Sequence, residues 1–279
     1  MPNITVNGID HHYRLEGPAD APVLTLAHAQ GFTLDSWAAQ FDHFAGRYRV
    51  FAPDLRGHGG TAMAGAAYRI EDLAADIVAL LDALGIERTH YAGASLGGMA
   101  GFALALDHAD RLRSVSFVTT QGILPQTSID GQRAATDVMR RDGAKARVDA
   151  ILERYLRKGY REDRPDSYAE LRRQFLNVPV EGYAEAGAAI FAMDFDDRIG
   201  AIDLPVMVIA GEHDIATTPE RMALYRDGIP GARMDIVPNA GHMPYVEEAG
   251  AFNAILAGKL ALISPVITFA EGRCVASIM

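Results

Sequence analysis

The sequence predicts an α/β protein in which a mostly parallel sheet is covered by helices and interrupted by one helical insertion. Short β-rich runs alternate with amphipathic helical segments along most of the chain, the pattern typical of a parallel sheet with helical crossovers. The alternation stops near residue 123 and resumes after residue 200. We therefore expect a core formed by residues 1–122 and 201–279 and a helical cap formed by residues 123–200.

Eight segments have the character of strands. The first two are predicted to form a hairpin that turns at Asn7 and Gly8, because this dipeptide suits a tight hairpin turn. The other six are short apolar runs that end in turn or loop residues. The predicted strands are residues 3–6, 9–15, 23–28, 48–53, 90–94, 112–119, 205–210 and 234–237.

Helices are predicted from apolar residues spaced three and four apart. Between residues 70 and 84 this spacing runs from Ile70 through Leu73 and Ile77, and Gly85 ends the helix. The same reasoning predicts helices over residues 99–106, 219–227 and 247–262. Residues 264–279 show no clear period, and no element is predicted there.

Charge and cysteine content exclude several classes of protein. A net charge of −10 and a pI near 5.3 argue against a nucleic-acid partner, whose phosphates would be repelled. The single cysteine, Cys274, permits neither an internal disulfide nor a cysteine metal cluster and favours a reducing compartment. The N-terminus lacks the features of a signal peptide, and no apolar run is long enough to span a membrane. We expect a cytoplasmic protein without nucleic-acid or membrane partners.

Residues 93–97 have the pattern G-x-S-x-G, with a predicted strand before them and a predicted helix after them. In this arrangement a sharp strand-to-helix turn exposes the serine hydroxyl, and flanking glycines avoid a clash within the turn. The pattern alone is short and is more often a structural turn. Its position between strand and helix makes Ser95 the candidate nucleophile.

A serine hydroxyl needs a base that takes its proton and an acid that orients the base. Asp214 ends the loop that follows strand 205–210, and His242 lies in the loop that follows strand 234–237. Both therefore lie at the carboxyl ends of strands, where open α/β sheets build their sites. Glu212 is the competing acid, but Asp214 at the end of the loop is preferred.

Acyl transfer also requires N–H donors for the developing oxyanion. One is expected from the backbone of Leu96, which follows the candidate nucleophile. The second should come from the loop after strand 23–28, where Gln30 is preferred over Ala29. Asp54, Arg56 and His58 have catalytic residue types, but here we expect a hydrogen-bonded turn.

Together these motifs resemble the α/β-hydrolase superfamily, which implies an eight-stranded, mostly parallel sheet with a helical cap. Residues 181–190, 193–195 and 229–233 further resemble 3-oxoadipate enol-lactonases. That resemblance implies opening of a carboxylate-bearing enol-lactone in the catabolism of aromatic compounds. The superfamily motifs are residues 54–59, 93–99, 211–214 and 241–242.

The chain also departs from the lactonase pattern. Residues 28–33 differ from the Asn-Ser-Leu-Gly-Thr type, and Tyr155 and Leu156 stand where the lactonases tend to have Trp-Phe. Between residues 140 and 173 the sequence has eleven Lys or Arg and seven Asp or Glu, which gives a local charge of +4. This charge favours an anionic substrate, although solvated helix faces explain the same count.

We therefore expect a serine hydrolase of small-molecule esters or lactones that needs no metal or organic cofactor. Two other functions remain open: hydrolysis of a carbon–carbon bond in a vinylogous diketone, and ligand reception on the same fold without catalysis. Dehalogenase and epoxide hydrolase chemistry would require an aspartate in place of Ser95. The sequence is compatible with a homo-oligomer and does not determine the oligomeric state.

Overall fold

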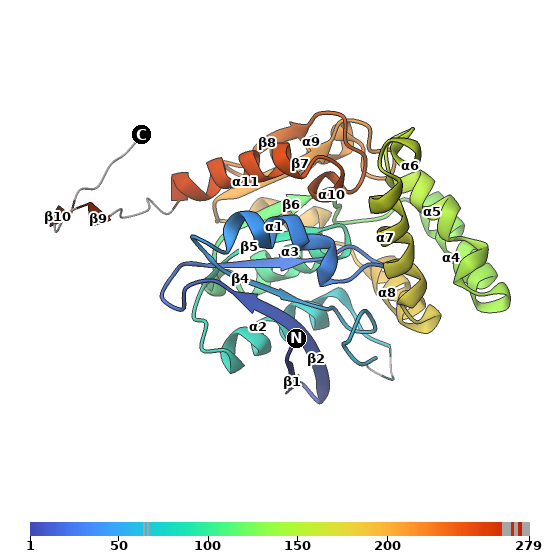
Figure 1. Ribbon diagram of the computed structural model, residues 1–279, viewed down its shortest axis with the longest axis horizontal. Coiled ribbons are helices and arrows are strands. Elements are labelled where there is room, and N and C mark those ends of the chain that lie inside the picture. Colours follow the sequence, from blue (N-terminus) through green and yellow to red (C-terminus); the bar gives the residue numbers. More distant parts are fainter. Residues whose placement is uncertain (64, 66, 264–268, 271–272, 275–279) are drawn as a thin grey trace.

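The computed structural model describes residues 1–263 except 64 and 66, together with residues 269–270 and 273–274 (Figure 1). It contains an eight-stranded sheet of order β1-β2-β4-β3-β5-β6-β7-β8, which confirms the predicted fold class. β1 and β2 pair antiparallel, as do β2 and β4, and every pairing from β4 to β8 in that order is parallel. The strands are β1 (Asn3–Val6), β2 (Ile9–Glu16), β3 (Val23–Ala27), β4 (Arg49–Pro53), β5 (Thr89–Ala94), β6 (Leu112–Val118), β7 (Val206–Gly211) and β8 (Arg233–Val237).

The hairpin of β1 and β2 turns where the sequence predicts. Asn7 and Gly8 have φ values of 51° and 75°, the positive angles that a two-residue turn of this kind needs. Val6 then pairs with Ile9. Local turn chemistry alone therefore sets the register of this edge of the sheet.

Helices cover both faces of the sheet. The buried apolar residues form two clusters, one containing side chains of α2 (Ile70–Ala83), α3 (Leu96–Asp107) and α9 (Pro219–Gly228). The other contains side chains of α1 (Ala38–Phe44) and α11 (Ala249–Ile263). Figure 1 shows α1 and α11 on one side of the sheet and α2 on the other. Every residue of β5 and β7 is buried, as expected for central strands covered on both faces.

The predicted amphipathic helix is α2. Its apolar stripe, which includes Ile70, Leu73 and Ile77, is buried against the core. Asp72 accepts a hydrogen bond from the N–H of Arg69 at 2.7 Å and so caps the first turn. Gly85 follows with φ 65°, a conformation that glycine adopts without strain.

A helical segment separates β6 from β7. Figure 1 shows its helices gathered beyond one end of the sheet. Its contact with the core is close, because a Cβ on Gly182 would lie 2.1 Å from the carbonyl oxygen of Gly57. The helices are α4 (Gln126–Asp142), α5 (Val148–Tyr155), α6 (Tyr160–Asp163), α7 (Pro165–Asn177) and α8 (Val180–Ala192). Short 3-10 turns are η1 (Leu34–Trp37), η2 (Ala109–Arg111), η3 (Ala144–Ala146) and η4 (Asp196–Ala201).

Two predicted helix boundaries are wrong. The helix predicted over residues 99–106 begins directly at Leu96, because the glycines after Ser95 pack within its first turn. The helix predicted over residues 247–262 is divided into α10 (Pro244–Glu247) and α11, since Glu248 has the non-helical angles φ −133° and ψ 57°.

The end of the chain is described only in part. The assignment of residues 264–268, 271–272 and 275–279 to the core lies outside the described residues. Two short strands, β9 (Phe269–Ala270) and β10 (Arg273–Cys274), pair antiparallel with each other. None of the helices in the described part of the chain combines the length and apolar character needed to cross a bilayer.

Candidate active site

Ser95 lies at the turn from β5 into α3 in a strained backbone conformation. Its φ of 48° and ψ of −111° are unusual for a residue with a side chain. Two close approaches require the neighbouring glycines. A Cβ on Gly93 would lie 2.3 Å from the carbonyl oxygen of Gly97, and one on Gly97 would lie 2.3 Å from that of Ala27. The predicted strand–turn–helix geometry around Ser95 is thus present.

Asp214 lies in the loop after β7, and its side chain is held from several directions. Oδ1 accepts hydrogen bonds from the N–H groups of Ala216 and Thr217 at 2.7 and 3.0 Å. Oδ2 accepts from the Thr217 hydroxyl at 2.6 Å and contacts Nδ1 of His242 at 2.8 Å. Burial disfavours ionisation of Asp214, but His242 and the hydrogen bonds from Thr217 together lower its pKa. The carboxylate is therefore buried, ionised and aimed at the imidazole.

His242 lies in the loop after β8 and is only 3% exposed. Its backbone N–H donates to the carbonyl of Tyr155 at 2.6 Å, and its carbonyl accepts from the Thr119 hydroxyl at 2.9 Å. The Tyr155 ring lies 4.7 Å from the imidazole between centroids. Because Nδ1 faces Asp214, Nε2 is the ring nitrogen left for a further partner.

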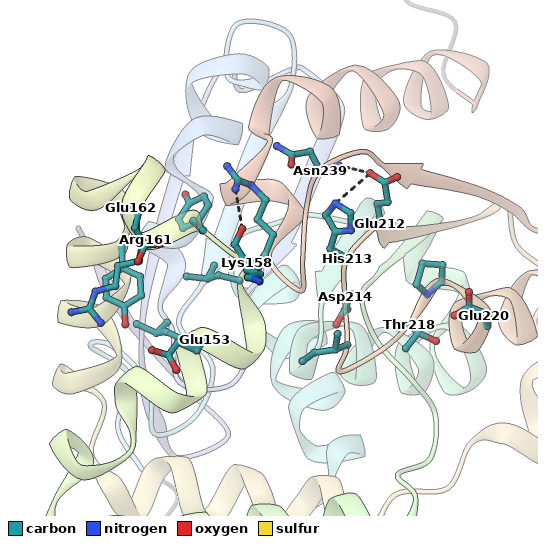
Figure 2. A pocket seen from close by; sticks show the side chains of 18 residues that line it. Glu153, Lys158, Arg161, Glu162, Glu212, His213, Asp214, Thr218, Glu220 and Asn239 are labelled. Atoms are coloured by element: carbon teal, nitrogen blue, oxygen red, sulfur yellow. Dashed lines mark hydrogen bonds and ion pairs between the residues drawn. The ribbon is translucent and has the colours of Figure 1, made fainter.

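The competing acid, Glu212, does not contact the imidazole of His242. Its carboxylate accepts from the N–H of Asn239 at 2.8 Å and lies 3.8 Å from Nε2 of His213 (Figure 2). Of the two carboxylates in this loop, Asp214 is the one that lies against His242.

The loop after β3 lies against the first turn of α3. The N–H of Gly97 donates to the carbonyl of His28 at 3.1 Å, which joins the two segments. Leu96 is the first residue of α3, and N–H groups in the first turn of a helix have no intrahelical acceptor. Gln30 lines the same cavity as Ser95, whereas Ala29 is not among the described lining residues. The side chain of Gln30 donates to the carbonyl of Tyr183 at 2.8 Å, which ties this loop to α8.

A cavity of about 250 Å³ brings the predicted residues together. Ser95, His242 and Gln30 line it from the core, and Arg147, Arg154 and Tyr183 line it from the helical segment. No Asp or Glu is among the residues described as lining it. The space next to Ser95 is therefore electropositive on its outer side.

A larger groove of about 1030 Å³ lies on the other side of the loop that carries Asp214 (Figure 2). Ile215 and Thr218 line this groove, whereas Ala216 and Thr217 line the cavity of Ser95. The loop between Asp214 and Thr218 thus separates the two spaces. Ser95 is not among the residues described as lining the groove.

Asp54 and His58 form a hydrogen-bonded turn, as predicted. Oδ1 of Asp54 accepts from the N–H of Leu34 at 2.8 Å, and Oδ2 accepts from that of Gly60 at 2.9 Å. His28 joins the same network, since its Nε2 accepts from the N–H of Leu55 at 2.9 Å. These groups brace the loops that border the cavity and do not line it.

Several residues that support the site were missed from the sequence. Thr217, Arg147 and Arg154 line the cavity, and Glu247 binds the loop of His242. Arg147 is the N-cap residue of α5 and Arg154 lies in its last turn, and this spacing of seven, about two helical turns, was a detectable signal. No sequence pattern predicted Thr217 or Glu247, because the groups that they bind are brought into place only when the loops of Asp214 and His242 fold. Among the described residues no group of three or more His, Cys, Asp or Glu is arranged to hold a metal ion.

The family model for the alpha/beta hydrolase fold matches residues 22–249. The chain belongs to the α/β-hydrolase family. The match spans both the turn at Ser95 and the loops of Asp214 and His242.

Relatives within this α/β-hydrolase family include lactonases. A 3-oxoadipate enol-lactonase 2 from Acinetobacter baylyi is 29% identical over 250 residues, which cover 90% of this chain and 92% of the relative. A putative carbamate hydrolase RutD from Variovorax paradoxus is 33% identical over 264 residues, 91% of this chain and 97% of the relative. The solved enol-lactonase from Burkholderia xenovorans LB400 has a TM-score of 0.89 and 34% identity, covering 93% of this chain and 100% of its own. The chain is thus a hydrolase of the ester and lactone type, and the enol-lactonase resemblance is confirmed.

Proposed function

We propose that this hydrolase cleaves a carboxylic ester or lactone through an acyl-enzyme on Ser95. The observation that carries the proposal is the hydrogen bond between Asp214 and His242 beside a cavity that Ser95 and His242 both line. A strained nucleophile, a base and an orienting carboxylate in this order are what acyl transfer requires.

In the first step Ser95 attacks the carbonyl carbon while Nε2 of His242 takes the hydroxyl proton. Asp214 keeps the proton on Nδ1 and stabilises the imidazolium that forms. The N–H groups of Leu96 and Gln30 bind the oxyanion, a role supported by the hydrogen bond that joins their two segments.

In the second step His242 returns the proton to the leaving oxygen, and the acyl group stays on Ser95. Water then attacks the acyl-enzyme with His242 again as base, which releases the acid and restores the serine. For a lactone the alcohol and the acid remain on one molecule. Every proton in this sequence is carried by a group of this chain or by water.

We further propose that residues 123–200 act as the cap that selects the substrate. The cavity walls support this, because one side belongs to the core and the other to α4, α5 and α8. Loops and insertions at this edge of an α/β sheet commonly set specificity while the scaffold fixes the catalytic groups.

Within this cap, Arg147 and Arg154 support an anionic substrate. Both line the cavity, and neither makes an ion pair with a described carboxylate. Burial raises the pKa of the Tyr183 hydroxyl in the same cavity, and the charges of Arg154 and Arg147 oppose that rise. Other basic residues of the cap are neutralised instead, in the pairs Arg140–Glu181, Arg141–Asp142, Arg157–Asp163, Arg172–Asp149 and Arg173–Glu170.

The relatives favour cleavage of a bond between a carbonyl carbon and a heteroatom over cleavage of a carbon–carbon bond, since they are named as lactonases and putative carbamate hydrolases. We also expect the protein to work in a reducing compartment such as the cytoplasm, because it has a single cysteine among 279 residues.

A panel of lactones, carbamates and short esters, assayed for kcat/KM, tests the proposed reaction. A fluorophosphonate should label Ser95, and mass spectrometry of the digested protein should find the adduct on its peptide. Turnover without labelling of Ser95 would contradict the proposed acyl-enzyme. Absence of turnover on the whole panel would favour a ligand receptor instead.

A further inference from the structure

Glu247 is a carboxylate buried beneath the loop that carries His242. It ends α10 and is only 4% exposed, although glutamates are rarely buried without partners. Oε1 accepts hydrogen bonds from the N–H groups of Gly241 and Met243 at 3.0 and 3.1 Å. These two residues flank His242 in the chain, so one carboxylate oxygen is hydrogen-bonded to the loop on both sides of His242.

The second oxygen of Glu247 binds the cap. Oε2 accepts from the N–H of Arg157 at 2.7 Å, a residue 90 positions earlier that follows α5. Two residues before it, the carbonyl of Tyr155 accepts from the N–H of His242. A Cβ on Gly241 would lie 2.6 Å from that carbonyl oxygen, so the segment lies directly against the loop.

We propose that Glu247 is a positioning residue that couples the cap to His242. The inference rests on the proposed roles of Ser95, Asp214 and His242. Arg154 and Tyr155, at the end of α5, line the cavity and adjoin the segment that Glu247 binds. A substrate that moves this end of α5 therefore moves the loop of His242 with it, and the cap affects the reaction as well as binding.

The charge of Glu247 belongs to this role. Burial raises its pKa, whereas the N–H groups of Arg157, Gly241 and Met243 and the nearby His242 oppose that rise. The ionised carboxylate fits these donors because it has only acceptor sites. A negative charge at this place favours the imidazolium. The charged and titratable groups around the imidazole are Asp214 from the loop after β7, Glu247 from α10, Tyr155 from α5, and Arg147 and Arg154 across the cavity.

Glu247→Gln distinguishes the contact of Glu247 with the loop of His242 from its contact with the cap. The amide oxygen can still accept from Gly241 and Met243, whereas the amide NH2 would face the N–H of Arg157 and break the link to the cap. We expect kcat to fall about 10- to 100-fold through misalignment of the base, with KM within about two-fold, because Glu247 does not line the cavity. The acidic limb of the pH profile of kcat/KM should move to lower pH by about half a unit or more, since a negative charge is lost.

Two variants accompany it. Glu248→Gln removes the adjacent carboxylate, whose hydrogen-bond partner among the described residues is the side chain of Asn239, and should behave like the wild type. Glu247→Asp keeps the charge but shortens the side chain, so kcat should fall while the acidic limb stays in place. This variant also serves if Glu247→Gln fails to fold.

Titration of the His242 imidazole by NMR provides a readout independent of turnover. Its pKa should fall in Glu247→Gln and stay unchanged in Glu248→Gln. If no substrate is turned over, the proposed function fails while this titration still tests the coupling. The coupling is overturned if Glu247→Gln lowers only the melting temperature, with the kcat, pH profile and imidazole titration of the folded protein equal to those of Glu248→Gln.

Discussion

Asp214 Oδ2 lies 2.8 Å from His242 Nδ1, although 28 residues separate them in the chain. The loops after β7 and β8 meet because these strands pair in parallel and therefore end at the same edge of the sheet. The same carboxylate oxygen accepts the hydroxyl of Thr217 at 2.6 Å, so its orientation is determined before any substrate binds.

Asp214→Asn is expected to lower kcat by about three to four orders of magnitude. The amide cannot stabilise the imidazolium and favours the wrong tautomer of His242. Steady-state hydrolysis of an activated ester measures the effect. Glu212→Gln is the matched control and should stay within about three-fold of the wild type, because Glu212 contacts Asn239 and His213 instead. A greater loss in Glu212→Gln than in Asp214→Asn would show that the acid is misassigned.

Ser95→Ala should retain the fold and lose about four to six orders of magnitude in kcat, the scale for removal of an acyl-enzyme nucleophile. The fold should persist because the strained turn depends on the glycines on either side of Ser95 rather than on its hydroxyl. Circular dichroism and hydrolysis of the same ester are the measurements. Activity above a hundredth of the wild-type rate in the purified variant would refute the assignment.

Arg154→Gln should lower kcat/KM for a carboxylate-bearing enol-lactone about 10- to 100-fold. A hydrogen bond to a charged group contributes about 1.5–3 kcal/mol, and Arg154 has no described ion pair that competes with the substrate. The methyl ester of the same lactone should change less than about two-fold, and salt should weaken only the charged substrate.

Arg141→Gln is the control for this effect, because Arg141 belongs to the same cap but is exposed and paired with Asp142. Equal losses for the acid and its methyl ester in Arg154→Gln would mean that the guanidinium shapes the cavity and does not bind an anion.

The free energy of unfolding should decrease as the pH is lowered from 6.5 to 4, because His28 and His58 are buried as neutral groups. Burial lowers the pKa of His28 to about 3 and that of His58 to about 4, and Nε2 of His58 has no acceptor in the described part of the chain. The unfolded chain takes up these protons near pH 6.5, whereas the folded chain takes them up only at lower pH. The unfolded state thus binds more protons across this range, and acidification reduces the free energy of unfolding.

Each of these histidines contributes a slope of up to about 1.4 kcal/mol per pH unit. His58→Gln removes one of them and keeps an N–H donor for the carbonyl of Arg56, so the slope should decrease by about that amount. Urea unfolding from pH 4 to pH 7 measures it, with the surface substitution His43→Gln as control. An unchanged slope in His58→Gln would assign the acid sensitivity to other groups.

The sequence determined the fold class and the three residues of the proposed catalytic centre. Strand character, the glycines around Ser95 and the order of Ser95, Asp214 and His242 are local features, and the parallel sheet then brings the ends of its strands to one edge. The sequence favoured Asp214 over Glu212 only by its place at the end of the loop, whereas the contact of Asp214 with the imidazole is visible only in the packed structure.

Only the tertiary structure decided what surrounds that centre. The net charge of the cap does not show which basic residues lie beside the cavity. Folding places Arg147 and Arg154 in the cavity lining and pairs many of the other basic residues with carboxylates. Glu247 meets Arg157 across 90 residues, and no period or motif in either segment encodes that contact. The physical reason is that a hydrogen bond requires its donor and acceptor to be placed to within a few tenths of an ångström. Such distances are set by how separate elements pack, and local sequence preferences do not specify them.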